Sequence, residues 1–120
     1  MGPNLRRTVT DEKIDRLVKV FKQLRLQKRE MSAQELATLF YIGSRHDCHK
    51  TALEQDLNFT TASSSRNTDK LSKYHRLSHI AGLDLIVKEV EEVSPHRQRL
   101  RLTKKGEDLM NQIKEILYGP

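Results

Sequence analysis

The stretch from Thr51 to Leu71, TALEQDLNFTTASSSRNTDKL, contains two short helical patterns with almost no chain between them. Leu53 and Leu57 are four residues apart, which places both on one face of a first helix. Asn58 follows, and asparagine tolerates the left-handed backbone conformation that ends a helix. Thr60 can then cap a second helix with its side-chain oxygen. Two helices joined by such a tight turn are typical of a helix-turn-helix.

A β-hairpin is predicted directly after the second helix. Gly82 interrupts the helical pattern, and the following LDLIVKEVEEV is rich in Leu, Ile and Val, which is typical of a strand. The tripeptide SPH supplies a turn, and RQRLRLT returns as a second strand. A hairpin that follows a helix-turn-helix is the wing of a winged helix. We therefore predict a mainly α (α+β) fold, a winged helix-turn-helix with a two-stranded β-hairpin wing.

Amphipathic helices are predicted at both ends of the chain. The first begins near Thr10, and its apolar side chains recur at helical spacing. They are Ile14, Leu17, Val18, Phe21 and Leu24. The last helix is capped by Thr103 and carries a second apolar face. That face consists of Leu109, Ile113, Ile116 and Leu117, with Met110 beside them.

A further helix is predicted from Ala33. It follows a capping box, SAQE, in which Ser32 and Glu35 each bond the other's backbone amide. Gly43 is expected to end this helix in a left-handed conformation. The next residues, SRHDCH, are expected to form a polar connection.

These elements predict one domain over residues 10–118, after a flexible tail of residues 1–9. Within the domain, the helix-turn-helix is expected at about 49–76, the wing at about 84–103 and the C-terminal helix at about 104–118. The chain has one cysteine, Cys48, and it has neither a secretory signal pattern nor an apolar run of membrane-spanning length. We therefore expect a cytoplasmic protein that does not associate with a membrane.

The hairpin suggests its own register. A three-residue turn at residues 94–96 would place Glu91 opposite Arg99, and Glu89 opposite Arg101. The same register predicts a buried face. It consists of Ile86, Val90, Leu100 and Leu102. His96 and Arg97 remain at the tip with no acidic partner, and they are therefore candidates to contact a phosphate or a narrow minor groove.

The sequence from residue 32 to 117 resembles the MarR-type winged-helix regulators. LTKKG, after the second predicted strand, is similar to the family's LTxxG, which closes the wing and opens the next helix. ALEQDLNFTTASSSRNTDKLS is similar without gaps to the family pattern eLaxxLxlsxstvSrxvdxL. The matching residues are Leu53, Leu57, Phe59, Thr60, Ser65, Arg66, Asp69 and Leu71. Two apolar positions of the family's recognition helix are occupied by Ser64 and Thr68 here.

The resemblance implies a homodimer formed through the N- and C-terminal helices. Each subunit would place one recognition helix in a major groove of double-stranded DNA, and the wings would reach the flanking backbone or minor groove. The implied recognition positions are Thr61, Ala62, Ser63, Ser65, Arg66 and Asp69. The family's wing arginine would fall at or beside His96 and Arg97.

The residue types at these positions suit DNA. The planar guanidinium of Arg66 fits guanine O6 and N7 or a pair of phosphates, so Arg66 is our first candidate. Asp69 is expected to orient Arg66 or to pair with Lys73 rather than to touch DNA. Short hydroxyl side chains near the helix N-terminus can bond phosphate. They belong to Thr61, Ser63 and Ser65.

Other functions find less support in the sequence. HDCH at residues 46–49 and the pair His75 and His79 contain metal-ligand types, but neither has a known zinc spacing, and we expect no metal and no cofactor. Cys48 could sense oxidants, but nothing except nearby histidines would lower its pKa, and a chance cysteine is the preferred interpretation. No paired carboxylates, nucleophile motif or phosphate-binding loop predicts an enzyme, and nothing supports a small-molecule effector.

The charge balance favours an acidic partner. Lys and Arg number 22 against 16 Asp and Glu, which gives a net charge of +6. The sequence therefore predicts a homodimeric, DNA-binding transcriptional regulator. The alternative is a winged-helix module that binds another protein and lacks specific DNA readout. Steep loss of affinity for DNA with salt would distinguish the first from the second.

Overall fold

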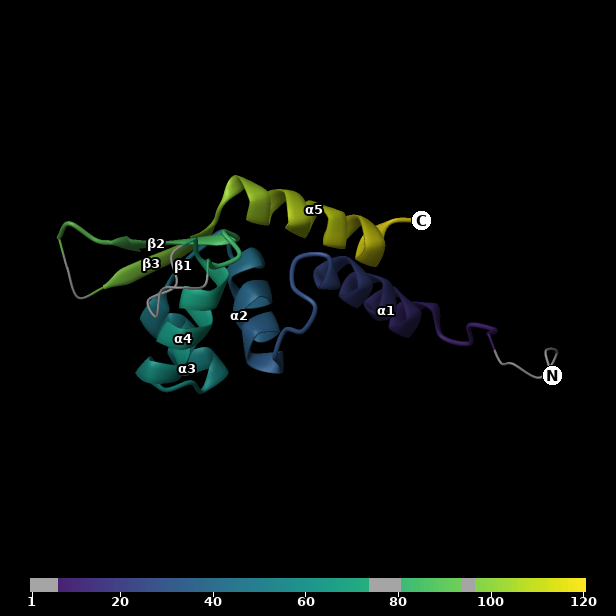
Figure 1. Cartoon of the computed structure of the whole chain (residues 1–120), viewed down its shortest axis with the longest axis horizontal. Coiled ribbons are helices and arrows are strands. Elements are labelled where there is room, and N and C mark those ends of the chain that lie inside the picture. The colour runs from purple at the N-terminus through teal and green to yellow at the C-terminus, as the bar shows by residue number, and fades with distance from the viewer. Residues whose placement is uncertain (1–6, 74–80, 94–96) are drawn as a thin grey trace.

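The computed structural model describes residues 7–73, 81–93 and 97–120 of the chain (Figure 1). Its elements follow the predicted order with one strand added. They are α1 (Glu12–Arg25), α2 (Ala33–Gly43), β1 (Asp47–His49), α3 (Lys50–Leu57), α4 (Thr61–Leu71), β2 (Ile86–Val90), β3 (Gln98–Leu102) and α5 (Lys104–Tyr118). Residues 7–9 are exposed and have no helix or strand, and the rest of the predicted tail lies outside the described residues.

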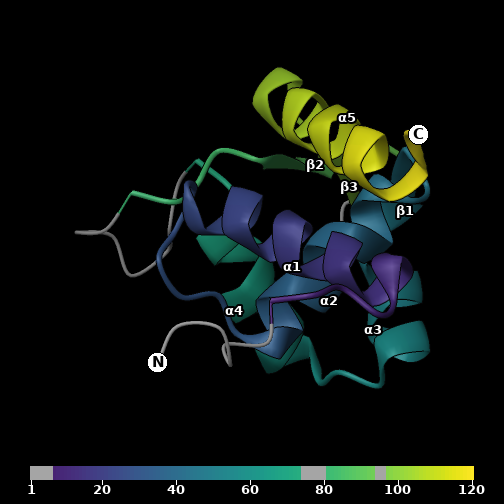
Figure 2. The same cartoon turned by 90° about the vertical axis from the view of Figure 1, so that its right-hand side faces the viewer.

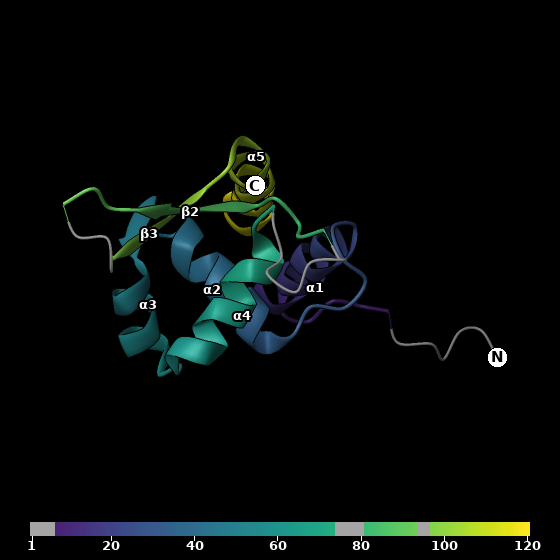
Figure 3. The same cartoon turned by 60° about the vertical axis from the view of Figure 1, so that its left-hand side comes forward.

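The helices form two groups. Helices α2, α3 and α4 lie together beneath the sheet, whereas α1 and α5 lie side by side toward the other end of the molecule (Figures 1 and 2). Helix α2 links the groups because it packs against α3, α4, β3 and α5. The hairpin of β2 and β3 projects from the helices on the side opposite α1 (Figure 3). This hairpin is the predicted wing, and the fold is a winged helix.

The sheet has three strands rather than the predicted two, in the order β1-β3-β2. The added strand, β1, lies in the segment that we expected to be a polar connection between helices. It pairs antiparallel with β3, and Cys48 faces Leu100 across the pair. The prediction failed because a three-residue strand with one inward side chain has no periodic pattern. Its hydrogen bonds depend on the free edge of β3, which is distant in sequence.

The predicted hairpin register is wrong by two residues. Ile86 pairs with Leu102, Lys88 with Leu100 and Glu89 with Arg99. A shift of two keeps every side chain on its predicted face, because strands alternate with a period of two. The observed register places Ile86, which is 1% exposed, opposite the buried Leu102, whereas the predicted register would have placed Val90 opposite Leu100. Val90, predicted to be buried, is 58% exposed.

The turn between α3 and α4 has the predicted chemistry. Asn58 ends α3 in the left-handed conformation, with φ 57° and ψ 44°. The hydroxyl oxygen of Thr60 then accepts a hydrogen bond from the amide of Ser63 at 3.0 Å. Phe59 packs against the hydrophobic core beside this turn. The helix-turn-helix is therefore confirmed.

Gly43 does not have the predicted role. The capping box of Ser32 and Glu35 is present, but α2 continues through Gly43 without a left-handed residue at its end. The chain turns instead at His46, where φ is 63°. Gly43 faces α5 closely, since a Cβ atom there would meet the end of the Met110 side chain, which would have to move. The glycine lets α2 and α5 approach closely.

Helix α1 buries much less of its apolar face than its spacing predicts. Of the predicted face only Leu24 is buried, and Val20 is buried beside it. The other four side chains are 43–60% exposed. They are Ile14, Leu17, Val18 and Phe21. Within the described part of the chain, no helix is both long and apolar enough to span a membrane.

Candidate nucleic-acid interface

The exposed side of α4 carries most of the predicted recognition residues. Thr61, Ala62 and Arg66 are exposed, and Ser65 is half-buried. Within the described part of the chain, the Arg66 guanidinium forms neither a hydrogen bond nor an ion pair. Ala62 and Arg66 are four residues apart and therefore share one helix face. This face can accept a planar partner without first breaking an internal contact of Arg66.

The opposite side of α4 is buried, although its side chains are polar. Ser64 and Thr68, which occupy apolar positions of the resembled pattern, are both 0% exposed. The Thr68 hydroxyl donates to the carbonyl of Ser64 at 2.7 Å. The Ser64 hydroxyl donates to the carboxylate of Glu54 on α3. These bonds satisfy the buried hydroxyls, whose burial would otherwise be costly.

Glu54 is held in place from two directions. Its carboxylate accepts the Ser64 hydroxyl and, at 2.7 Å, the ammonium of Lys50. Burial alone would raise the pKa of Glu54, but hydrogen bonds from Lys50 and Ser64 outweigh burial and lower it. Glu54 is therefore ionised at neutral pH, and the charge-assisted hydrogen bond from Ser64 links the two helices of the helix-turn-helix.

A second link joins α4 to the start of α2. The side-chain oxygen of Gln34 accepts hydrogen bonds from the Ser63 hydroxyl at 3.0 Å and from the Asn67 amide at 3.1 Å. Ser63 was a predicted DNA contact, but its hydroxyl already donates a hydrogen bond to Gln34 within the protein. One turn further on, Lys70 lies 3.8 Å from Glu35 of α2. The sequence pattern does not predict these contacts between α4 and α2, because the contacting residues are about thirty positions apart.

Asp69 contacts an unexpected partner. We expected it to orient Arg66 or to pair with Lys73, but its buried carboxylate forms an ion pair with Lys88 of β2. The Lys88 ammonium also lies 3.4 Å from the carbonyl of Ser65. We call Asp69 with Lys88 the helix–wing ion pair, since it connects α4 directly to the wing.

The arginines of the wing differ in their partners. Arg101 bonds Glu89 at 2.5 Å, and Arg99 lies 3.3 Å from Asp47 and 3.8 Å from Glu91. The predicted pairs of Arg99 with Glu91 and of Arg101 with Glu89 are thus confirmed, although the shifted register makes them diagonal neighbours. Arg97 is exposed and has no ion-pair partner in the described segments. His96 lies outside those segments.

The candidate metal ligands and Cys48 lie partly within the described residues. The described residues contain no group of three or more His, Cys, Asp or Glu side chains arranged to hold a metal. Alternation along β1 points Cys48 inward and its two neighbours outward, which separates the side chains of HDCH. The Cys48 thiol is buried, and burial raises its pKa, with Asp47 adding to the effect. His75 and His79 lie outside the described residues.

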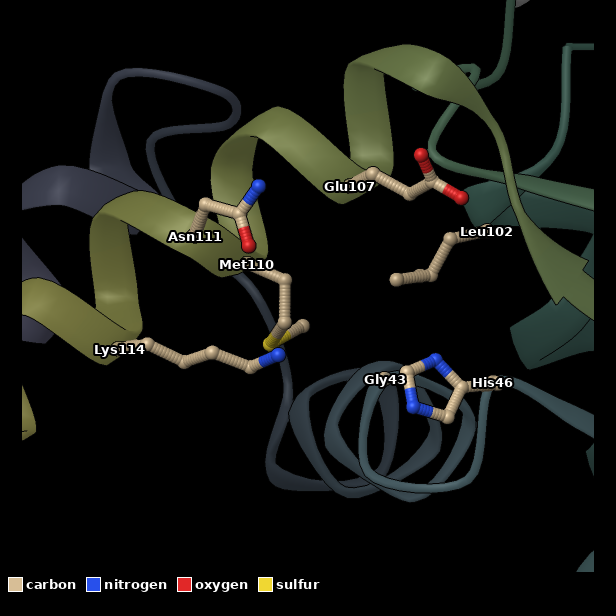
Figure 4. Close-up of a pocket in the computed structure, with 7 residues that line it drawn as sticks. All are labelled: Gly43, His46, Leu102, Glu107, Met110, Asn111 and Lys114. Carbon is tan, nitrogen blue, oxygen red and sulfur yellow. The ribbon is translucent and has the colours of Figure 1, made fainter.

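One small pocket lies between the end of α2 and the first half of α5 (Figure 4). Its volume is about 200 Å³. The lining residues are Gly43, His46, Leu102, Glu107, Met110, Asn111 and Lys114. Pockets for drug-sized ligands are typically about 300–1,000 Å³, so this pocket is smaller than that range.

The exposed helix face and the adjoining wing belong to a winged-helix fold, and solved structures of MarR-family regulators have the same fold. A mutant of MepR from S. aureus matches with a TM-score of 0.65 and 18% identity, over 86% of this chain and 68% of that one. MarR matches with a TM-score of 0.58 and 17% identity, over 83% and 71%. Overoxidised AbfR bound to DNA matches with a TM-score of 0.61 and 12% identity, over 87% and 70%. No protein-family model and no curated protein sequence matches the chain.

Proposed function

We propose that this chain is a homodimeric transcriptional regulator, not an enzyme, that binds double-stranded DNA in a sequence-specific manner. Helix α4 enters the major groove, and the tip of the wing reaches the flanking backbone or minor groove. The observation that carries this proposal is the Arg66 guanidinium, exposed on α4 and without a partner among the described residues. An unpaired guanidinium keeps its donors available for guanine O6 and N7 or for phosphate.

The attachment of α4 supports this role. Glu54 of α3, Gln34 of α2 and Lys88 of β2 each contact α4 through polar groups. Base readout requires side chains held within a fraction of an ångström of their targets. A helix attached to three separate elements can present its exposed residues in a fixed orientation.

The likeness to a DNA-bound structure and the charge of the chain also support the proposal. The AbfR structure that this fold resembles is a complex with DNA. The net charge of +6 favours approach to a polyanion. The proposal includes a cytoplasmic location, because the partner is DNA and Cys48 is a free thiol.

The apolar face of α1 supports dimerisation. Four large side chains on this face are 43–60% exposed in the single chain. They are Ile14, Leu17, Val18 and Phe21. Contiguous exposed apolar surface of this kind marks protein contacts. A second copy seated here would lie at the α1–α5 end and would leave both wings free for DNA (Figure 1).

The test is selection of bound duplexes from a random DNA library, followed by anisotropy titration of the selected duplex and of a scrambled duplex at several salt concentrations. A dimer of this fold should select a palindrome with half-sites about one helical turn apart. Its affinity for both duplexes should fall steeply with salt because phosphate contacts release counterions. No selected sequence and no salt-dependent binding would contradict the proposal and favour a protein-interaction module.

A further inference from the structure

Strand β2 carries a charged side chain on its inner face. Lys88 lies between Ile86 and Val90 on the side of the strand that points toward the helices, and it pairs across the sheet with Leu100. Its side chain is only 16% exposed. A buried lysine is rare unless it is paired, because removing an ammonium from water is costly. The position therefore requires a specific partner.

That partner lies on α4. The Asp69 carboxylate, itself only 12% exposed, bonds the Lys88 ammonium. The same ammonium lies 3.4 Å from the carbonyl of Ser65, one turn earlier on the helix. Lys88 thus contacts two successive turns of α4, at Ser65 and at Asp69. A single side chain spans the two elements proposed to contact DNA.

Each residue of the helix–wing ion pair lies on the same element as a proposed DNA-binding residue. Asp69 lies three residues after Arg66, so one helical turn joins the ion pair to the base-reading guanidinium. Lys88 lies on the same hairpin as Arg97. A rotation of α4 relative to the wing would stretch the ion pair and separate two largely buried charges, which is unfavourable.

We propose that Lys88 is a positioning residue that fixes the wing relative to α4 through its ion pair with Asp69, so that Arg66 and Arg97 reach DNA in one geometry. This inference rests on the proposed DNA-binding function. Lys88 acts through Asp69 and does not itself contact DNA. The helix–wing ion pair determines discrimination between sequences more than the strength of phosphate binding.

The decisive variant is the double substitution Lys88→Met with Asp69→Asn. It removes the ion pair and keeps the net charge of the protein, so the overall attraction to DNA is unchanged. The matched control is Lys19→Met with Asp15→Asn, which removes an ion pair between an exposed lysine and a half-buried aspartate on α1. Each protein is titrated with the selected duplex and with a scrambled duplex of equal length, at a temperature where circular dichroism shows it folded.

The ratio of the two affinities should fall about tenfold in the Lys88/Asp69 variant, which is within the range for one lost bidentate base contact. The dependence of affinity on salt should stay the same. A merely structural loss would lower both affinities equally and leave their ratio unchanged. An unchanged ratio, or a salt slope reduced as for a lost phosphate contact, would overturn the proposal. The control should match the unsubstituted protein.

A second measurement does not depend on DNA. Amide hydrogen exchange of the free protein should be faster in α4 of the Lys88/Asp69 variant and unchanged in the control, because the helix has lost its link to β2. Equal exchange in α4 would overturn the positioning role. If the unsubstituted protein bound no duplex, the proposed function would fail, and exchange alone would still decide whether Lys88 holds α4.

Discussion

The hydroxyl of Ser64 on α4 donates a hydrogen bond to the carboxylate of Glu54 on α3, and Ser64 is completely buried. Such a contact joins the two helices of the helix-turn-helix at a position that is apolar in the resembled pattern. A polar pair here is directional, so it specifies the angle between the helices as well as their separation. The stability of α4 therefore depends on hydrogen bonding more than its sequence pattern suggests.

Substitution of Ser64 by Ala should lower the free energy of unfolding by about 2 kcal/mol, because a buried hydrogen bond to a charged group is lost. Urea unfolding followed by circular dichroism measures the change. Ser65→Ala is the control, since Ser65 is half-buried on the same helix, and it should cost less than about 0.5 kcal/mol. Equal effects of the two substitutions would show that the bond to Glu54 contributes nothing.

The contribution of Glu54 should depend on pH. Its pKa is lowered from 4.5 in the folded protein, so the stabilisation is complete above the unfolded pKa and is lost as pH falls through the folded pKa. The difference in unfolding free energy between the unsubstituted protein and Glu54→Gln should therefore be largest near neutral pH and should shrink in acid. Urea unfolding over a pH series tests this. A difference that stayed constant or grew in acid would contradict the assigned role.

Arg66→Ala should weaken binding to the selected duplex by about 1–3 kcal/mol and should reduce discrimination against scrambled DNA. The physical reason is the loss of a planar pair of donors at a base edge. Anisotropy titration of both duplexes gives the two affinities. Arg25→Ala is the control, because Arg25 is an exposed arginine in the last turn of α1. If Arg25→Ala had the same effect, Arg66 would contribute only charge.

Arg97→Ala should weaken binding to the selected and scrambled duplexes alike, and it should reduce the salt slope by about 1, as expected for a phosphate contact. Arg101→Ala provides a comparison within the same hairpin, since Glu89 already engages that guanidinium. Its effect on the slope should be smaller. A larger effect of Arg101→Ala on the salt slope would indicate that the body of the hairpin, and not the wing tip, contacts DNA.

Phe21→Asp should convert the proposed dimer into a monomer. Phe21 is 45% exposed in the single chain, so the subunit should stay folded while a charge enters the apolar interface. Sedimentation equilibrium gives the mass, and circular dichroism checks the fold. Lys22→Asp introduces the same residue at the adjacent exposed position and should leave the dimer intact. A monomeric unsubstituted protein would contradict the proposal directly.

Features governed by local interactions were predictable from the sequence. Asn58 and Thr60 ended one helix and began the next as expected, and Thr103 caps α5 through the amide of Gly106. Each depends on the preferences of one residue and a bond to a residue a few positions away. The same local information located α4 and hence the candidate Arg66.

Features governed by distant contacts were not predictable. Strand β1 exists because the edge of β3 is available to it, and the hairpin register depends on the burial of Ile86 against Leu102. The pairing of Asp69 with Lys88 joins residues nineteen positions apart. In each case the deciding partner is brought close only by the folded chain, so no periodicity in the sequence signals it.

Burial of Cys48 has a practical consequence for measurements on this protein. The chain has one cysteine, and its thiol is shielded and has a raised pKa. Thiol reagents react with the thiolate, so this position should be slow to modify while the sheet is intact. A cysteine introduced at the wing or on α4 could then carry a single fluorophore without removal of the natural one. Slow labelling of Cys48 itself would report transient opening of β1 from β3.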